Sequence, residues 1–368
     1  MKAKVYFAEL STSGKQVSLH EKMKKLFDAA GFAKMFSPGE IVAIKMHFGE
    51  KGNTAYISPT LARQVVDKIK DNGGKPFLTD TNTLYNGARA NGVDHLETAI
   101  YNGFAYAVVN APVIISDGVF SKSSVDVKID GKHFEKVKIA REIENVRSMV
   151  VLSHFKGHEM SGFGGAIKNL AMGCAPAAGK QQQHSVVKPK VKNSVCIGCQ
   201  TCLPYCPVEA ISMVGKKALI SNKCIGCGEC ISICPTRAII AQWDSEIPEF
   251  IERMAEYAKG AVLNKKGKTA YINVLMNITP LCDCYGFSGQ HIVPDIGILA
   301  SDDPIAIDSA SFDLVNNELG NLKSDLKCNH EHGKDKFKGL YSNIESSHVL
   351  DYGEEIGLGT REYELIKI

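Results

Sequence analysis

Apolar runs and amphipathic stretches alternate along most of this chain. Runs rich in Val, Ile, Leu and Ala favour buried strands, and apolar residues three and four positions apart favour helices packed on a core. The alternation predicts an α/β fold with a mostly parallel sheet and helices on both faces. The predicted strands are residues 4–10, 41–47, 75–80, 113–117, 149–154, 269–278 and 295–300. The predicted helices are residues 18–30, 59–72, 246–259 and about 301–318, with a hairpin at 125–139.

The alternation stops between residues 191 and 240, where closely spaced cysteines replace it. We therefore predict a discontinuous α/β domain, residues 1–190 and 241–368, that carries an inserted module at 191–240. Residues 175–192 contain three consecutive glutamines and a Lys-Pro-Lys sequence, and we interpret them as the linker that enters the module.

Eight of the 12 cysteines form two copies of the pattern Cys-x-x-Cys-x-x-Cys-x-x-x-Cys-Pro. With this spacing, three cysteines of one copy bind one iron–sulfur cluster and the fourth binds the other cluster. Structural zinc sites usually take Cys-x-x-Cys pairs instead, so the spacing argues against zinc. We predict two 4Fe–4S clusters, the first held by Cys196, Cys199, Cys202 and Cys234, the second by Cys224, Cys227, Cys230 and Cys206. The pattern resembles the two-cluster bacterial ferredoxins, which implies a small α+β module that transfers electrons.

Polar residues follow several of the predicted strands. Carboxyl ends of parallel strands share one edge of a sheet, where ligands bind, so we expect His47, Asp80 and His154 to lie close together. Taken singly, each histidine is more often an ordinary hydrogen-bonded loop residue. The candidate catalytic residues are His47, His154, Lys156, His158 and Lys168. Histidine and lysine together suit an anionic substrate or acid–base chemistry.

The remaining cysteines suggest a third site. Cys282 and Cys284 flank Asp283 just past a predicted strand, which suits a metal ion or a redox pair, although two buried thiols are the simpler alternative. Cys174 is a third candidate ligand for such a metal ion. The glycine-rich segment 162–165 lacks the spacing of a P-loop or a dinucleotide-binding loop, so it is a tight turn or an anion-binding helix start.

Several of these motifs together resemble one known family. They are Lys45-x-His47-x-Gly49, His154-x-Lys156-x-His158, the run Gly-Gly-Ala-Ile-Lys168-Asn169, the inserted cysteine module, and Ser-Asp-Asp-Pro-Ile-Ala-Ile-Asp308. The chain is similar over essentially its whole length to the family called domain of unknown function 362. The resemblance implies an iron–sulfur protein and carries no catalytic roles or substrate.

Composition narrows the setting. The net charge of +3, from 43 basic and 40 acidic residues, provides no broad basic field for nucleic acid. The sequence contains no run of 18 apolar residues, so we expect no membrane-spanning helix. Many cysteines in a long chain favour a reducing compartment, so we expect a cytoplasmic protein of an anaerobic host. A free-standing ferredoxin needs only about 60 residues, so the remaining chain favours an oxidoreductase over a simple carrier.

The predicted function is therefore an iron–sulfur redox protein whose module exchanges electrons with a polar cleft in the α/β domain. The expected partner is a redox protein or a small anionic substrate. The alternative is a non-enzymatic electron carrier in which the α/β domain docks a partner.

Overall fold

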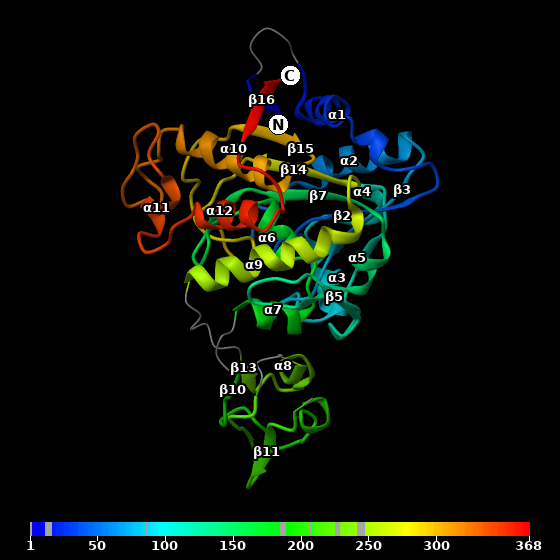
Figure 1. The fold of residues 1–368 in the computed structure, drawn as a ribbon, viewed down its shortest axis with the longest axis vertical. Helices are drawn as coiled ribbons and strands as arrows, with labels where there is room; N and C mark the ends of the chain where they lie inside the picture. The colour runs from blue at the N-terminus through cyan, green and yellow to red at the C-terminus, as the bar shows by residue number, and fades with distance from the viewer. Residues whose placement is uncertain are drawn as a thin grey trace.

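A mostly parallel sheet forms the centre of the molecule (Figure 1). The computed structural model describes residues 2–11, 17–85, 87–184, 189–206, 208–224, 229–240 and 247–368. Within them, eight strands lie in the order β16 (Tyr363–Lys367), β1 (Ala3–Glu9), β15 (Gly297–Ser301), β14 (Thr269–Leu275), β7 (Ser148–His154), β2 (Ile41–Lys45), β3 (Lys75–Asp80) and β4 (Val113–Ile115). Strands β14 to β4 run parallel, and β15 is antiparallel to both of its neighbours. The predicted α/β fold is confirmed.

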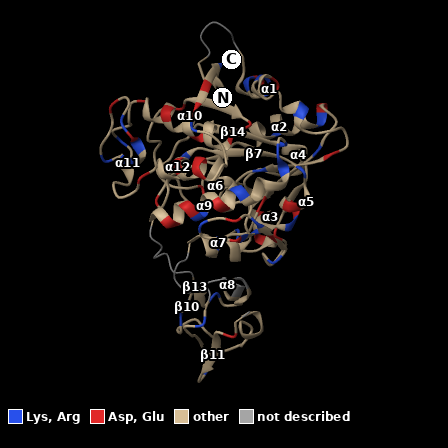
Figure 2. Ribbon diagram, viewed as in Figure 1, with Lys and Arg blue, Asp and Glu red and all other residues tan. Residues whose placement is uncertain are grey.

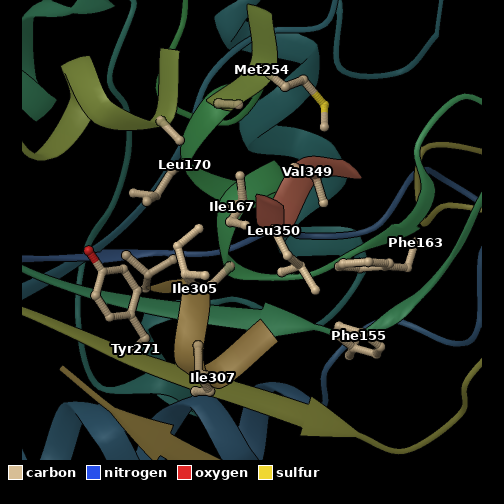
Figure 3. Close-up of a cluster of buried hydrophobic side chains, with 14 of the residues drawn as sticks. Phe155, Phe163, Ile167, Leu170, Met254, Tyr271, Ile305, Ile307, Val349 and Leu350 are labelled. Carbon is tan, nitrogen blue, oxygen red and sulfur yellow. The ribbon is translucent and has the colours of Figure 1, made fainter. Parts of the chain in front are cut away.

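Two hydrophobic cores cover the two faces of this sheet. Successive residues of β7 point to opposite faces, so Met149 and Val151 join one core and Val150 and Leu152 join the other. The first core contains residues of α5 (Arg141–Asn145), α6 (Ala166–Ala171), α9 (Ile247–Val262), α10 (Pro304–Asn316), α11 (Lys336–Leu340) and α12 (His348–Glu355). The second contains residues of α1 (Leu19–Ala29), η1 (Phe32–Met35), α2 (Pro59–Asp71), α3 (Gly92–Tyr101) and α4 (Tyr106–Val109). Figure 3 shows side chains of α6, α9, α10 and α12 meeting in the first core.

Local sequence signals explain where the main helices begin. Asp303 precedes α10 and accepts hydrogen bonds from the backbone N–H groups of Ile305 and Ala306, while Pro304 opens the helix. Ser18 caps α1 in the same way. The predicted hairpin is present as β5 (Ser124–Lys128) paired with β6 (Lys136–Ala140). The short helix η3 (Leu263–Lys265) follows α9.

The structure corrects the interpretation of residues 175–192 as a linker. Residues Ala177–His184 form helix α7, and its glutamines 181 and 183 are fully buried. Gln183 donates a hydrogen bond to the carbonyl oxygen of Ala171 at the end of α6. A run of glutamines resembles a solvated linker in sequence, but here the amides pack inside the α/β domain.

The cysteine-rich segment forms a small unit below α7 in Figure 1. Its described elements are β10 (Lys190–Val191), η2 (Leu203–Tyr205), β11 (Ile211–Val214), β12 (Lys217–Ile220), α8 (Glu229–Ile233) and β13 (Ile239–Ile240). Strand β10 pairs with β13 and β11 pairs with β12, both antiparallel. The pairing of β10 with β13 brings the two ends of the segment together, so we call residues 190–240 the module.

Across the described ranges, none of the helices combines the length and apolar character that a membrane crossing requires.

Candidate active site

A cavity of about 710 Å³ lies at the edge of the sheet where the parallel strands end. Loops after β2, β3, β7 and β14 line it, as do α6 and α7. The candidate residues that line it are His47, His154, Lys156, His158, Lys168, Cys282 and Cys284, together with Asp80. Residues far apart in the sequence therefore converge, as parallel topology predicts. Their catalytic role stays a prediction.

Cys174 lies elsewhere. Its side chain is fully buried in the first hydrophobic core and is not among the residues that line the cavity. Burial raises the pKa of the Cys174 thiol to about 11, so the neutral thiol is its stable form. Within the described residues, no group of three or more His, Cys, Asp or Glu side chains is arranged to hold a single metal ion. The third metal site stays a prediction.

Buried ion pairs form the wall beside β2 and β3. The Nζ of Lys45 lies 3.0 Å from a carboxylate oxygen of Asp80, and it donates a 2.6 Å hydrogen bond to Oδ1 of Asn169 on α6. Burial opposes ionisation of Asp80, but Lys45 and the neighbouring basic groups outweigh it and hold its pKa below the usual range. The carboxylate therefore stays charged inside the protein.

A second ion pair involves residues that the sequence reasoning missed. The Nε of Arg89 lies 3.3 Å from Oε2 of Glu50, and Arg89 also donates to the hydroxyl of Tyr85. Arg89 and Glu50 are both buried. No periodicity or motif marks Arg89, because it lies in an irregular loop between β3 and α3; only the fold brings it to the cavity.

The three histidines have different surroundings. The backbone N–H of Gly49 donates to Nδ1 of His47, so the neutral ring carries its proton on Nε2, which lies 3.6 Å from Sγ of Cys284. Burial and the positive charge of Arg89 lower the pKa of His47 to about 3. His158 is also kept neutral, because burial and the nearby Lys168 lower its pKa.

His154 is held from both sides. Its Nδ1 lies 2.9 Å from a carboxylate oxygen of Asp283, and its Nε2 lies 2.9 Å from the carbonyl oxygen of Met276. Asp283 also lies 3.5 Å from Nζ of Lys156. Burial opposes the charge on Asp283, but His154 and Lys156 outweigh it and lower its pKa. The imidazole is occupied by these contacts, which orient the loop that carries Cys282 and Cys284.

The two thiols of that loop lie side by side. Sγ of Cys282 is 2.7 Å from Sγ of Cys284, and Nζ of Lys168 is 2.8 Å from Sγ of Cys282. The hydrogen bond from Cys282, with help from the charges of Lys168 and Arg89, lowers the pKa of Cys284 to about 5. Burial raises the pKa of Cys282. The pair therefore combines one thiolate with one thiol.

Helix α6 brings Lys168 to the cavity. The carboxylate of Asp308 accepts hydrogen bonds from the backbone N–H groups of Ala166 (2.8 Å) and Ile167 (2.9 Å) at the start of α6. A Cβ on Gly165 would lie 2.3 Å from the same carboxylate, so only glycine fits there. The motif Gly-Gly-Ala-Ile-Lys168-Asn169 and the distant Asp308 thus form one structural unit.

The glycine-rich turn before α6 is a short hairpin, β8 (Lys156–His158) paired with β9 (Gly162–Gly164). A Cβ on Gly157 would lie 2.1 Å from the carbonyl oxygen of Pro280, in the loop that carries the two thiols. The backbone of Gly157 therefore approaches the backbone of Pro280 too closely for any side chain.

Helix α7 contributes Lys180 and His184 to the cavity, and both lie in the segment that the sequence analysis interprets as a linker. Lys180 donates hydrogen bonds to Oγ1 of Thr81 and to the carbonyl oxygen of Ala175. Burial lowers the pKa of Lys180 to about 8, although Asp117 partly offsets it. Burial and His158 likewise lower the pKa of His184 to about 3. A lysine that titrates near neutral pH can donate or accept a proton.

In the module, Cys196, Cys199, Cys202 and Cys234 line one small cavity. These are the four cysteines predicted to hold the first cluster, including the one from the other copy of the pattern. A Cβ on Gly198 would lie 2.5 Å from the carbonyl oxygen of Lys216, and Gly198 has a φ of +70°, so the turn between these cysteines requires glycine.

Donors to sulfur repeat in the two copies of the pattern. The backbone N–H of Ala210 lies 3.1 Å from Sγ of Cys206, and that of Ala238 lies 3.2 Å from Sγ of Cys234. In the second predicted set, Cys206, Cys224 and Cys230 are described, and Cys227 lies outside the described residues.

Comparisons with known proteins place the chain in a family. The family described as domain of unknown function (DUF362) matches residues 42–313. The comparison with curated proteins yields no match. The similar solved structures include the lactate racemase apoprotein from Thermoanaerobacterium thermosaccharolyticum (13% identity, TM-score 0.37, 75% of this chain and 51% of that chain) and a structural genomics target from Thermotoga maritima (9% identity, TM-score 0.36, 69% of this chain and 50% of that chain). This chain thus spans about half the length of each. Because the matched segment covers most of its 368 residues, the chain belongs to the DUF362 family of domains of unknown function.

Proposed function

We propose that this chain is an iron–sulfur oxidoreductase in which electrons pass between the module and the cavity of the α/β domain. The observation that carries the proposal is that the cavity and the module share lining residues. Leu84 lines the cavity and also belongs to the hydrophobic cluster that contains Cys202 and Cys230 of the module. Ala177 at the start of α7 packs in the same cluster, and α7 contacts α8 of the module.

The cysteines suit two 4Fe–4S clusters. Cys196, Cys199, Cys202 and Cys234 would hold one, and Cys224, Cys227, Cys230 and Cys206 the other. In a cubane each thiolate binds a different iron, so the ligands surround a cavity rather than converge on one point. Backbone N–H groups that point at sulfur, such as those of Ala210 and Ala238, stabilise the charge on such thiolates. Bound clusters would supply one-electron transfer.

The cavity suits a small anionic substrate. Five basic side chains line it: Lys45, Arg89, Lys156, Lys168 and Lys180. Lys45 and Arg89 are paired with the acidic residues Asp80 and Glu50, whereas Lys180 contacts a hydroxyl and a carbonyl oxygen. Outside the cavity, charges of both signs are mixed along helices such as α9, as Figure 2 shows. Three acidic side chains, Glu50, Asp80 and Glu159, also line the cavity, so basic groups are in excess among its described residues.

The chain's own residues provide proton transfer there. Lys180 can donate or accept a proton near neutral pH, whereas burial keeps His47 and His158 as neutral imidazoles that serve as hydrogen-bonding groups. A volume of about 710 Å³ suits a small molecule, since ligand sites commonly measure roughly 300–1,000 Å³.

The first test is cluster content. We expect about eight irons and about eight acid-labile sulfides per chain after anaerobic purification or reconstitution. Protein that carries zinc, or a single iron, contradicts the proposal.

The second test asks whether the cavity is where electrons leave or enter. Protein is reduced with dithionite, freed of excess reductant, and mixed with a panel of small anionic oxidants while cluster absorbance is followed. We expect a compound that reoxidises the native protein to react at least about tenfold more slowly with a Lys156→Met, Lys180→Met double variant, whose cavity has lost two charges. The control is Lys128→Met, since Lys128 is exposed. Equal rates in all three proteins would favour the electron-carrier alternative.

A further inference from the structure

We infer that Cys282 and Cys284 form a redox-active dithiol that reduces small disulfides bearing carboxylate groups. This inference names the substrate class of the proposed cavity and so rests on the proposed function. The sulfurs are 2.7 Å apart, closer than two sulfurs that merely pack together. An S–S bond measures roughly 2.05 Å, so closing the remaining gap requires a movement of less than about 1 Å.

The surroundings of the pair favour redox chemistry over metal binding. Nζ of Lys168 lies 2.8 Å from Sγ of Cys282 and donates a hydrogen bond to that sulfur. Lys156 and Arg89 line the same cavity. A divalent cation placed beside these groups would meet like charges, whereas a thiolate and an anionic substrate are both stabilised by them.

The two thiols differ in access. Both thiols line the cavity, but Cys282 is buried, whereas Cys284 is partly exposed and lies beside Nε2 of His47. A substrate disulfide that enters the cavity therefore meets Cys284 first. Cys284 is the attacking thiol and Cys282 the resolving thiol.

The chemistry balances in two exchanges. Sγ of Cys284 attacks one sulfur of the substrate, the substrate S–S bond breaks, and the departing sulfur takes up a proton. Sγ of Cys282 then gives up its proton and attacks Sγ of Cys284. The mixed disulfide breaks, and the second substrate sulfur leaves as a thiol. The pair has lost two electrons and the one proton of Cys282, and the substrate disulfide has gained those two electrons, that proton and a second proton from solvent, which together give two thiols.

Resetting the pair to one thiol and one thiolate requires two electrons and one proton. The reductant is a low-potential one-electron donor, and under the proposed function the module supplies it. A module with two one-electron centres matches the two-electron demand of one disulfide.

The first experiment follows the pair alone, in the full-length protein. The protein is equilibrated with mixtures of reduced and oxidised dithiothreitol, denatured and alkylated with iodoacetamide, and digested with trypsin. The tryptic peptide of residues 269–323 contains Cys282 and Cys284 and no other cysteine. We expect it to pass from doubly alkylated to disulfide-bonded in a single two-electron transition, while the peptide with the buried Cys174 stays alkylated throughout. A Cys282→Ser variant should lose the transition.

Two outcomes overturn the inference. One is a pair that stays doubly alkylated at every dithiothreitol ratio. The other is a native protein in which stoichiometric zinc protects both thiols from alkylation, which establishes a metal site. Neither readout depends on the clusters. Iron and sulfide content therefore decides the proposed function separately, and either conclusion can fail without the other.

The second experiment tests the substrate class. Reduced protein is mixed with dithiodiacetate, hydroxyethyl disulfide or cystamine, which are anionic, neutral and cationic disulfides, and oxidation of the 269–323 peptide is timed. We expect dithiodiacetate to react on the order of tenfold faster than hydroxyethyl disulfide, and cystamine to be slowest. In the Lys156→Met, Lys180→Met variant the ratio of anionic to neutral rates should fall toward one. Equal rates for all three compounds with the native protein would contradict the anionic substrate class.

Discussion

The module and the cavity of the α/β domain both gather cysteines, but by different routes. Cys196, Cys199 and Cys202 come together through one tight local turn, and Cys234 comes from a second copy of the same turn. Around Cys282 and Cys284, the neighbouring side chains come from four strand ends and two helices. A site made by a local repeat is visible in the sequence, whereas a site made by convergence depends on topology.

The two regions also differ in what stabilises them. The strands whose ends line the cavity are held by two large hydrophobic cores, one on each face of the sheet. The described part of the module has a small cluster of its own, centred on residues such as Ile211 and Ile239 and completed by its cysteines. Small units of this size usually need a metal or disulfides to stay folded. The folding of the module should therefore depend on its bound metal, and the stability of the residues around the cavity on their buried ion pairs.

Removing iron gives the largest expected difference between the regions. We expect anaerobic chelation with thiols kept reduced to abolish hydrogen-exchange protection across residues 190–240, because the module's apolar cluster is too small to hold it. Strands β7 and β14 should keep theirs. Hydrogen exchange read by mass spectrometry checks both in one sample, and a module that stays protected without iron would remove the contrast.

Breaking a buried ion pair should be the largest single-residue effect at the cavity edge. Lys45→Met leaves the buried Asp80 without its 3.0 Å partner, so we expect a loss of about 3 kcal/mol in unfolding free energy. The matched control is Lys128→Met, which breaks the exposed pair with Asp130 and should cost less than about 1 kcal/mol. Urea unfolding followed by far-UV circular dichroism measures both. Equal losses would mean that the Lys45 pair gains nothing from its burial.

The cap on α6 should have a smaller effect. Asp308→Ala removes the acceptor for two buried backbone N–H groups, and we expect it to cost about 2 kcal/mol. Asp302→Ala, at an exposed position on the same stretch, should change stability by less than about 0.5 kcal/mol. The same unfolding assay separates them. A neutral Asp308→Ala would show that α6 is positioned by its packing alone.

The smallest expected effect concerns a contact between the α/β domain and the module. Nζ of Lys122 lies 3.4 Å from the centre of the Tyr205 ring in η2, a cation–π contact worth about 0.5–1 kcal/mol at an exposed site. We expect Lys122→Ala to leave both units folded and to increase hydrogen exchange of η2 and of the loop around Lys122. Lys128→Ala serves as the control, and identical exchange in the two variants would indicate that other contacts hold the module.

Much of the fold follows from local sequence. The positions of most strands along the chain follow from apolar runs, and α10 begins where Asp303 and Pro304 predict it. Cys234 lines one small cavity together with the cysteines of the first copy, and their role as the ligands of one cluster stays a prediction. The misinterpretation of Ala177–His184 has a physical cause: polar glutamines favour solvent unless a tertiary partner such as the Ala171 carbonyl oxygen is available.

The sequence by itself determined which side chains stand at the strand ends. Strand periodicity is a local property of the sequence, and the strand ends of any parallel sheet share one edge. Only the tertiary structure decided their chemistry. It paired Lys45 with Asp80, brought Arg89 from an irregular loop, and buried Cys174 while leaving Cys284 at the cavity. Protonation, charge and sulfur–sulfur distance depend on burial and on partners from distant segments, and these exist only once the sheet has assembled.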